Sequence, residues 1–273
     1  MMHPAVLDEP RTQAPPERRV ATVSGVERLG AYRVVTALDA SGPVDPRPGQ
    51  FYMLAAEERW GGGGDERPYL PRAFSYARAR PTADGVELDF LLESVGPGTA
   101  RLATLEPGEG LALVGPLGMG FRGPPAGARP LLVGGGIGTA PLLCLQDELG
   151  PAATVLLGFR SEAHAEAAAL FAGSPALATD DGSVGRHALV TDLLREQLAA
   201  DPGATVFACG PHAMLEAVRA LCAELAVPAQ LALESGMACG FGACFGCVVP
   251  TRDGYLRLCV DGPVLDADWL EVV

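Results

Sequence analysis

The stretch Leu131-Leu-Val-Gly-Gly-Gly-Ile-Gly-Thr-Ala-Pro141 decides what the middle of this sequence can fold into. A short apolar run is followed by closely spaced glycines and then by a proline, which the first turn of a helix accepts. Glycines between a strand and a helix let the backbone approach a diphosphate, and the helix N-terminus supplies partial positive charge. The stretch therefore predicts a dinucleotide-binding loop, although Thr139 replaces the last glycine of a full G-x-G-x-x-G and an ordinary tight turn is the alternative.

Downstream of this loop, short apolar runs and helical patterns alternate along the chain. Strands are expected at 131–133, 154–159, 176–179 and 205–209, and helices at 140–148, 162–171, 188–198 and 212–225. Such alternation predicts βαβ units and therefore a parallel sheet. A second strand end, Cys209-Gly210-Pro211, would lie at the same sheet edge as the glycine loop, so the two could flank one crevice. Cys209 could then touch a reacting ring, although a lone cysteine is more often a small buried core residue.

Upstream of the loop the sequence has a different pattern of apolar and turn-forming residues. Short β-like runs separated by glycine and proline are expected at 32–37, 50–54, 73–77, 86–92 and 110–114, which predicts an antiparallel barrel or sandwich. The glycine-rich stretch at 61–71 is interpreted as a flexible insertion. We expect four units: a disordered tail at 1–18, a β-barrel at 19–122, an α/β domain at 130–228 and a cysteine-bearing segment at 231–273.

Four of the seven cysteines lie in that last segment. Cys239, Cys244 and Cys247 form C-x4-C-x2-C and Cys259 follows, which is the plant-type ferredoxin spacing for a [2Fe-2S] cluster. The glycines between them suit a loop whose backbone N–H groups must come close to sulfur. A zinc site of four thiolates usually has two C-x2-C pairs, so zinc and a group of merely buried thiols are the weaker alternatives.

Bulk properties exclude several function classes. The formal net charge is -13 and the sequence contains no lysine, which argues against nucleic acid as a partner. No apolar stretch reaches the roughly 20 residues that span a bilayer. An odd number of cysteines without an export signal favours metal ligation over disulfides. We therefore expect a soluble cytoplasmic protein with neither a membrane nor a nucleic-acid partner.

Two motifs in the upstream half could bind a flavin nucleotide. Arg72, Ala73, Phe74 and Ser75 form R-x-x-S, in which the guanidinium can pair with a diphosphate and the hydroxyl can hydrogen-bond to the flavin. Gly96-Pro-Gly-Thr99 offers a second phosphate-binding turn before a short helix. Each signal alone is weak, because an arginine in a strand is ordinarily a surface residue.

Taken in order, these motifs resemble the ferredoxin–NADP reductase superfamily. The tail M-A-C-G-F-G-A-C-F-G-C-V-V at 237–249 and C-V-D-G-P-V-L at 259–265 resemble more closely the electron-transfer subunits of class 1B dihydroorotate dehydrogenase. A departure is Ala73, which replaces the proline that is usual in the R-P-x-S of the family. The resemblance extends from about residue 19 to the end of the sequence.

The resemblance implies three cofactor sites. FAD would be held in the barrel by Arg72, Ala73, Phe74, Ser75, Leu91, Leu92, Glu93, Gly98 and Thr99. NADH would be received by Gly134, Gly135, Gly136, Ile137, Gly138 and Thr139, together with Cys209, Gly210 and Pro211. One [2Fe-2S] cluster would be ligated by Cys239, Cys244, Cys247 and Cys259.

The implied function is electron transfer between NAD(H), FAD and the cluster, and onward to an FMN-containing dihydroorotate dehydrogenase catalytic subunit in a heterotetramer of pyrimidine biosynthesis. No catalytic acid or base is required of this chain itself, since the cofactors carry the chemistry. An electron-transfer subunit of an NAD(P)H:ferredoxin or sulfur-linked oxidoreductase is the nearest alternative, and a flavin and iron–sulfur redox sensor is one of another class. Arg160 could meet the extra phosphate of NADPH or only solvent, so the choice between NADH and NADPH stays open.

Overall fold

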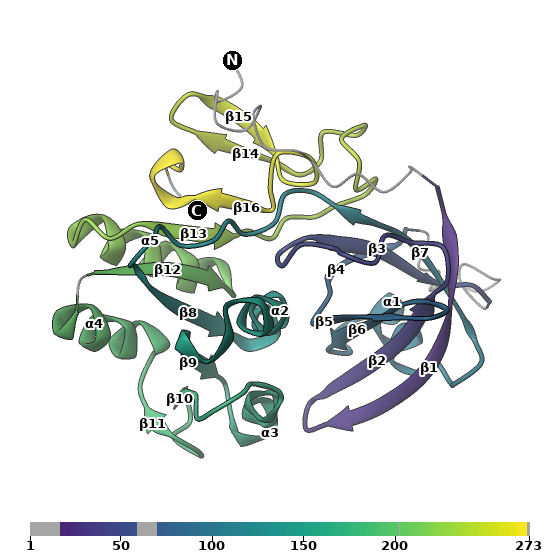
Figure 1. Cartoon of the computed structure of the whole chain (residues 1–273), viewed down its shortest axis with the longest axis horizontal. Coiled ribbons are helices and arrows are strands. Elements are labelled where there is room, and N and C mark those ends of the chain that lie inside the picture. Colours follow the sequence, from purple (N-terminus) through teal and green to yellow (C-terminus); the bar gives the residue numbers. More distant parts are fainter. Residues whose placement is uncertain (1–16, 59–69, 202, 272–273) are drawn as a thin grey trace.

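The computed structural model describes residues 17–58, 70–201 and 203–271. It shows two sheets beside each other, with the C-terminal segment lying across one end of both (Figure 1). The predicted tail at 1–18 and the predicted insertion at 61–71 fall almost entirely outside the described residues. None of the helices in the described part of the chain is both long and apolar enough to cross a membrane.

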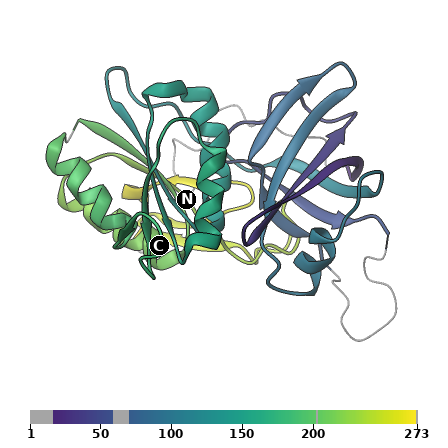
Figure 2. The same cartoon turned by 90° about the horizontal axis from the view of Figure 1, so that it is seen from below.

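The first sheet is antiparallel throughout, with strand order β4-β3-β7-β1-β2-β6-β5. Its strands are β1 (Arg19–Leu29), β2 (Tyr32–Asp39), β3 (Phe51–Ala56), β4 (Arg72–Ser75), β5 (Arg78–Thr82), β6 (Gly85–Leu92) and β7 (Gly110–Leu117), and helix α1 (Pro97–Ala103) lies between β6 and β7. The sheet curls into a half-barrel (Figure 2). The prediction of an antiparallel barrel is confirmed in this form.

The second sheet has the order β11-β10-β9-β8-β12-β13-β16. Its strands are β8 (Arg129–Gly135), β9 (Thr154–Phe159), β10 (Ala176–Thr179), β11 (Arg186–His187), β12 (Ala204–Cys209), β13 (Ala229–Ala232) and β16 (Val264–Asp266). All pairs are parallel except β13 with β16, which confirms the predicted α/β architecture.

Helices cover this sheet on both faces. They are η2 (Gly136–Thr139), α2 (Ala140–Leu149), η3 (Gly150–Ala152), α3 (Glu162–Ala165), η4 (Glu166–Leu170), α4 (Val190–Ala200) and α5 (His212–Glu224). Helices α2 and α3 face the half-barrel, whereas α4 and α5 lie on the far side (Figure 1). The single helix predicted at 162–171 is in fact α3 followed by the 3-10 turn η4.

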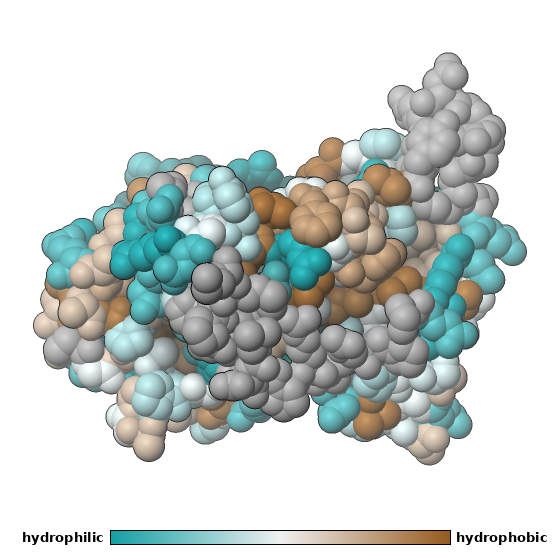
Figure 3. All heavy atoms as spheres, turned by 90° about the horizontal axis from the view of Figure 1, so that it is seen from above, coloured by the Kyte–Doolittle hydropathy of each residue, from teal (hydrophilic) through white to brown (hydrophobic). Residues whose placement is uncertain are grey.

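The C-terminal segment leaves the second sheet after β13 and returns to it. It forms the cysteine loop, the hairpin of β14 (Val248–Thr251) and β15 (Gly254–Arg257), then β16 and the turn η5 (Ala267–Trp269). Strand β16 pairs antiparallel with β13, with Leu265 opposite Leu231. A glycine-rich segment with little core of its own is thus anchored at both ends of the cysteine loop. The view onto this face shows apolar side chains gathered next to a hydrophilic stretch (Figure 3).

The two halves share their cores. Cys144 of α2 packs in the core of the half-barrel, whereas Phe51 and Met53 of β3 pack in the core of the second sheet and the C-terminal segment. Arg78 and Asp147 add an ion pair of 2.9 Å across the junction. The relative position of the halves is therefore fixed by side chains that cross between them.

An ion pair lies inside the half-barrel. The Arg19 Nη2 atom is 2.7 Å from the Asp39 carboxylate and donates a second hydrogen bond of 2.7 Å to the Gly115 carbonyl. The two side chains are only 7% and 1% exposed. A buried pair of this kind depends on both partners, because either charge alone would be left desolvated.

Replacing Asp39 with alanine is expected to lower the free energy of unfolding by about 3–5 kcal/mol, because the Arg19 guanidinium would keep a buried charge without a carboxylate opposite it. Urea unfolding followed by circular dichroism measures the change. The matched control is Glu196→Ala, which removes the exposed 2.6 Å pair with Arg186 and should lower the free energy of unfolding far less, because water screens both charges. An equal loss of unfolding free energy in the two variants would show that burial does not determine how much the Arg19–Asp39 pair contributes.

Candidate functional site

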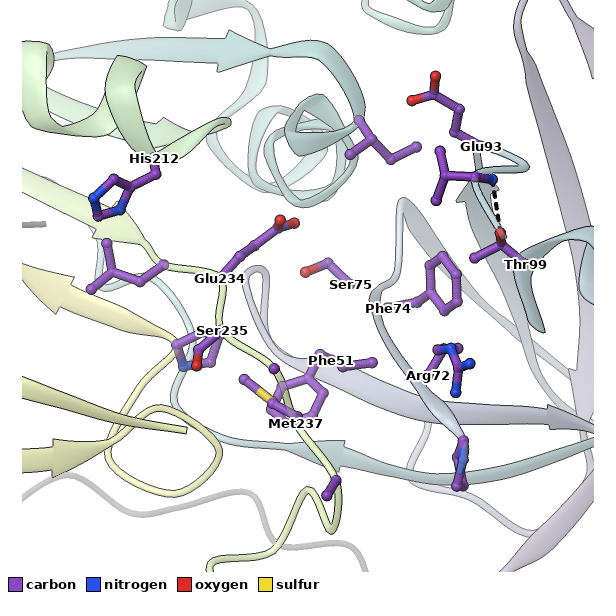
Figure 4. A pocket seen from close by; sticks show the side chains of 18 of the residues that line it. Phe51, Arg72, Phe74, Ser75, Glu93, Thr99, His212, Glu234, Ser235 and Met237 are labelled. Atoms are coloured by element: carbon purple, nitrogen blue, oxygen red, sulfur yellow. Dashed lines mark hydrogen bonds between the residues drawn. The ribbon is translucent and has the colours of Figure 1, made fainter. Parts of the chain in front are cut away.

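A cavity of about 940 Å³ lies where the half-barrel, the second sheet and the C-terminal segment meet (Figure 4). Strand β4 contributes one wall, the ends of β8 and β12 contribute the second, and the chain between β13 and the first cysteine contributes the third. The predicted site residues that line it are Arg72, Ala73, Phe74, Ser75, Glu93, Thr99, Ile137 and Gly210. The structure thus brings the R-x-x-S strand and both predicted loops to one space.

On the half-barrel wall, Arg72 and the α1 segment lie against each other. A Cβ atom at Gly98 would stand 3.0 Å from the Arg72 guanidinium, so any larger residue here would press on that side chain. The Thr99 hydroxyl accepts hydrogen bonds from the backbone N–H groups of Val95 (2.9 Å) and Gly96 (3.0 Å), which fixes the turn. The Arg72 guanidinium and the turn before α1 lie on one wall, and a guanidinium in this place fits the diphosphate of a flavin dinucleotide.

Leu91 and Leu92 are placed differently from the other predicted flavin residues. Both side chains are 1% exposed and pack inside the protein rather than on the cavity wall.

On the second wall, the two predicted nucleotide loops touch. A Cβ atom at Gly138 would come within 2.6 Å of the Gly210 backbone, so the contact depends on the missing side chain. The Thr139 hydroxyl donates to the Gly136 carbonyl at 3.0 Å and is therefore used inside the turn. Gly134, Gly135 and Pro211 lie in the same two loops, outside the cavity lining. Loops held this close present their backbones together, as a dinucleotide site requires.

Cys209 ends β12 beneath this wall. Its side chain is buried, and burial raises the pKa of its thiol well above the ordinary range, with the charge of Glu234 adding to the effect. The thiol is therefore neutral.

Glu234 is a cavity residue that sequence reasoning missed. It follows β13 and points into the cavity toward Ser75 (Figure 4). The side chain meets the solvent of the cavity, yet protein surrounds it, and this enclosure raises the pKa of its carboxyl group. Its position at the end of an apolar strand, five residues before Cys239, was the signal that could have found it. His212, Ser235 and Met237 also line the cavity and were missed.

The four predicted cluster cysteines come together as two pairs. Cys239 lies beside Cys244, and Cys259 lies beside Cys247, whose sulfur accepts a hydrogen bond from the Cys259 backbone N–H at 3.4 Å. Within the described residues, no three histidine, cysteine or acidic side chains converge as ligands of a single metal ion would. Two pairs of sulfurs are the donor set that a [2Fe-2S] cluster uses, with two thiolates on each iron.

The loop around these sulfurs supplies backbone donors. Gly240 and Gly242 have φ of +80° and +86°, a conformation that favours glycine. The N–H of Gly246 points to the Cys244 sulfur at 3.4 Å, and that of Cys259 points to the Cys247 sulfur at 3.4 Å. Such donors favour thiolate, the form that binds metal.

The pKa values of the cysteines differ within the loop. Burial opposes ionisation of Cys239, but hydrogen bonds from the backbone N–H groups of Cys244, Phe241 and Ala243 and from the Cys244 thiol lower its pKa to about 6. Burial raises the pKa of Cys259 to about 12, and the neighbouring Cys247 thiol adds to this. The loop fits a cluster by its donor set and by its glycine backbone.

Comparison with known proteins starts from this segment. Residues 234–271 match the family model for the iron-sulfur cluster binding domain of dihydroorotate dehydrogenase B. A protein of Geobacillus thermodenitrificans named dihydroorotate dehydrogenase B (NAD(+)), electron transfer subunit, is 44% identical over 81% of this chain and 85% of its own length. A protein of the same name from Caldanaerobacter subterraneus subsp. tengcongensis is 34% identical over 84% of this chain and 87% of its own length.

The chain belongs to the family of dihydroorotate dehydrogenase B electron transfer subunits. Solved structures agree in fold. The NADH-dependent reduced ferredoxin-NADP oxidoreductase superposes with a TM-score of 0.76 at 23% identity, over 92% of this chain and 90% of that one. The ferredoxin reductase in carbazole 1,9a-dioxygenase gives 0.62 at 22% identity, over 77% and 66% of the two chains. This chain therefore has a ferredoxin reductase-like core, and an iron–sulfur binding segment follows it.

Replacing Gly138 with alanine is expected to weaken NADH binding, because the added methyl group would push the two loops apart. Overpacking of this kind costs about 1–3 kcal/mol, which corresponds to a loss of about tenfold or more in affinity. Isothermal titration calorimetry with NADH measures it. Gly123→Ala is the control, since nothing lies within 4 Å of a Cβ atom there; equal affinity in both variants would refute the loop contact.

Replacing Cys259 with serine is expected to remove most of the bound iron and acid-labile sulfide, because one sulfur pair would lose a ligand. The measurements are iron and sulfide content, visible absorption and the paramagnetic signal of the reduced protein. Cys222→Ser is the control, since Cys222 is buried on α5 apart from the loop. Full iron content in the Cys259 variant would exclude this cysteine as a ligand.

Proposed function

We propose that this chain is the electron transfer subunit of an NAD-linked dihydroorotate dehydrogenase and exchanges electrons between NAD(H), FAD and a [2Fe-2S] cluster. The observation that carries the proposal is the shared cavity. Strand β4, the two glycine loops and residues 233–238 all line it, and the last of these segments runs directly into Cys239. A protein arranged in this way can bring a nicotinamide, a flavin and a cluster close together.

FAD, when bound, couples the two-electron chemistry of NAD(H) to the one-electron chemistry of an iron–sulfur cluster. The chain supplies binding and orientation. Arg72 would pair with the FAD diphosphate, and the touching loops at Gly138 and Gly210 would receive the diphosphate of NAD(H). Cys239, Cys244, Cys247 and Cys259 would hold the two irons.

Glu234 and Ser75 extend the assignment on the flavin wall. Both line the cavity, and Figure 4 shows the Glu234 side chain directed toward Ser75. A carboxyl group with a raised pKa keeps its proton to a higher pH than an ordinary glutamic acid does. The two side chains would therefore orient the ring edge and carry the proton that accompanies electron transfer.

The proposed units follow from these sites. Residues 19–122 would bind FAD, 130–228 would bind NAD(H) and 231–273 would bind the cluster, although β16 of the last unit completes the second sheet. This layout supports an NADH-linked flavin and iron–sulfur oxidoreductase subunit that depends on another chain for its substrate.

The proposed partner is an FMN-containing dihydroorotate dehydrogenase catalytic subunit, in a heterotetramer. The relatives are named as electron transfer subunits, and such a subunit needs a second chain that holds the substrate. Cys244 is exposed, as are Phe241 and Phe245 on either side of it, at 57% and 64%. Exposed aromatic side chains are typical of interface cores. A partner on this face would shield the cluster from solvent and oxygen.

The purified chain with its cofactors is expected to reduce ferricyanide or a dye with NADH, and to leave dihydroorotate unchanged in the presence of NAD. Adding the catalytic subunit should restore dihydroorotate-dependent formation of NADH. The assay follows absorbance at the NADH band and orotate by chromatography. Oxidation of dihydroorotate by this chain alone would contradict the proposed division of labour.

A further inference from the structure

Arg160 occupies the position that reads the adenosine ribose in dinucleotide-binding folds. It follows β9 directly, and β9 is the second strand of the βαβ unit that carries the glycine loop. An acidic residue about 20 residues beyond the loop meets the ribose 2′-hydroxyl of NAD, whereas an arginine there accommodates the 2′-phosphate of NADP. Taken by itself, Arg160 would therefore predict NADP(H). The relatives, in contrast, are named as NAD(+) proteins.

The structure shows the Arg160 guanidinium already engaged. Its Nη2 atom donates to Glu93 Oε1 at 2.6 Å and lies 2.9 Å from His164 Nε2. Glu93 follows β6 of the half-barrel and also lines the cavity, so its carboxylate reaches from one half of the molecule to the nucleotide edge of the other.

His164 is held in place on both sides. Its Nδ1 atom is 3.0 Å from the Ser161 hydroxyl, and its ring packs edge-on against Tyr32 with 5.6 Å between centroids. Its Nε2 atom also lies 3.5 Å from Glu93 Oε1. The three side chains Arg160, Glu93 and His164 thus form one contact, here called the ribose-edge clasp, whose geometry is fixed from both halves.

We infer that Glu93 restrains Arg160 in the ribose-edge clasp and thereby sets the preference of the nucleotide site for NAD(H) over NADP(H). The inference rests on the proposed function and names the specificity determinant of that site. In the clasp, the Arg160 guanidinium is paired with a carboxylate that would repel an added phosphate.

A single substitution at Glu93 should be enough to change the ligand preference of the site. The Arg160 side chain is 67% exposed and that of Glu93 is 23% exposed, so the pair itself contributes little to stability. The Arg160 guanidinium could form a charge-assisted hydrogen bond to a dianionic phosphate, which is among the stronger polar contacts, but the Glu93 carboxylate beside it repels that phosphate. Removing the negative charge of Glu93 should therefore change ligand choice with little effect on folding.

The test compares two probes that differ only in the 2′-phosphate, adenosine 2′,5′-bisphosphate and adenosine 5′-monophosphate. Their dissociation constants are measured by calorimetry with the cofactor-loaded full chain. In the wild type the two constants should agree within about threefold. In Glu93→Gln the bisphosphate should bind about tenfold more tightly relative to the monophosphate, the size of one charge-assisted hydrogen bond. The ratio of kcat/KM for NADPH over NADH should rise in parallel.

Three further variants decide the origin of the change. Glu93→Gln combined with Arg160→Ala should return the ratio to the wild-type value. In Arg160→Ala alone, the ratio of the two dissociation constants should differ from the wild-type ratio by less than about threefold, because the guanidinium is already restrained. Glu216→Gln, which removes a 2.6 Å pair with Arg219 on α5, is the matched control and should change nothing.

Two outcomes would overturn the inference while leaving the proposed function intact. One is normal monophosphate binding with an unchanged ratio in Glu93→Gln, and the other is a loss of bisphosphate binding in Arg160→Ala alone. Binding of neither probe by the wild type, together with no reduction of a dye by NADH, would instead overturn the proposed nucleotide site and the role of the clasp with it.

Discussion

The antiparallel pairing of β13 with β16 is the constraint on which the rest of the molecule depends. The segment that carries the four cysteines begins after β13 and ends at β16, so this pairing holds both ends of the segment against the second sheet. The segment itself is rich in glycine and contributes only a small hairpin, so it could not keep a fixed place by its own packing. The sheet edge supplies the place, and residues 233–238 consequently form a wall of the cavity.

Electrostatics in the cavity follow from this closure. Burial raises the pKa of Cys209 at the end of β12, the charge of Glu234 adds to this effect, and the carboxyl group of Glu234 is itself partly enclosed. At Cys239 the opposite condition holds, because hydrogen bonds from backbone N–H groups outweigh burial and lower the pKa of its thiol, whereas burial raises the pKa of Cys259. Two neighbouring regions of one short segment thus favour opposite charge states, according to whether desolvation or hydrogen bonding dominates.

Much of this could be predicted from the sequence. The alternation after Leu131 predicted the parallel sheet, and the spacing of Cys239, Cys244, Cys247 and Cys259 predicted an iron–sulfur segment, which the family model matches at residues 234–271. Both signals are local patterns. The pairing of β16 with β13, the arrival of Glu234 opposite Ser75 and the contact of Glu93 with Arg160 join residues that are far apart in the chain. None of these has a periodic or spacing signature, so only the folded chain reveals them.

The crossing of core residues between the halves has a consequence for protein engineering. Cys144 belongs to the nucleotide-binding half by sequence yet fills the core of the half-barrel, and Phe51 and Met53 do the reverse. A chimera that joins the half-barrel of one reductase to the α/β half of another would therefore leave a void in each core unless these side chains were transplanted with it.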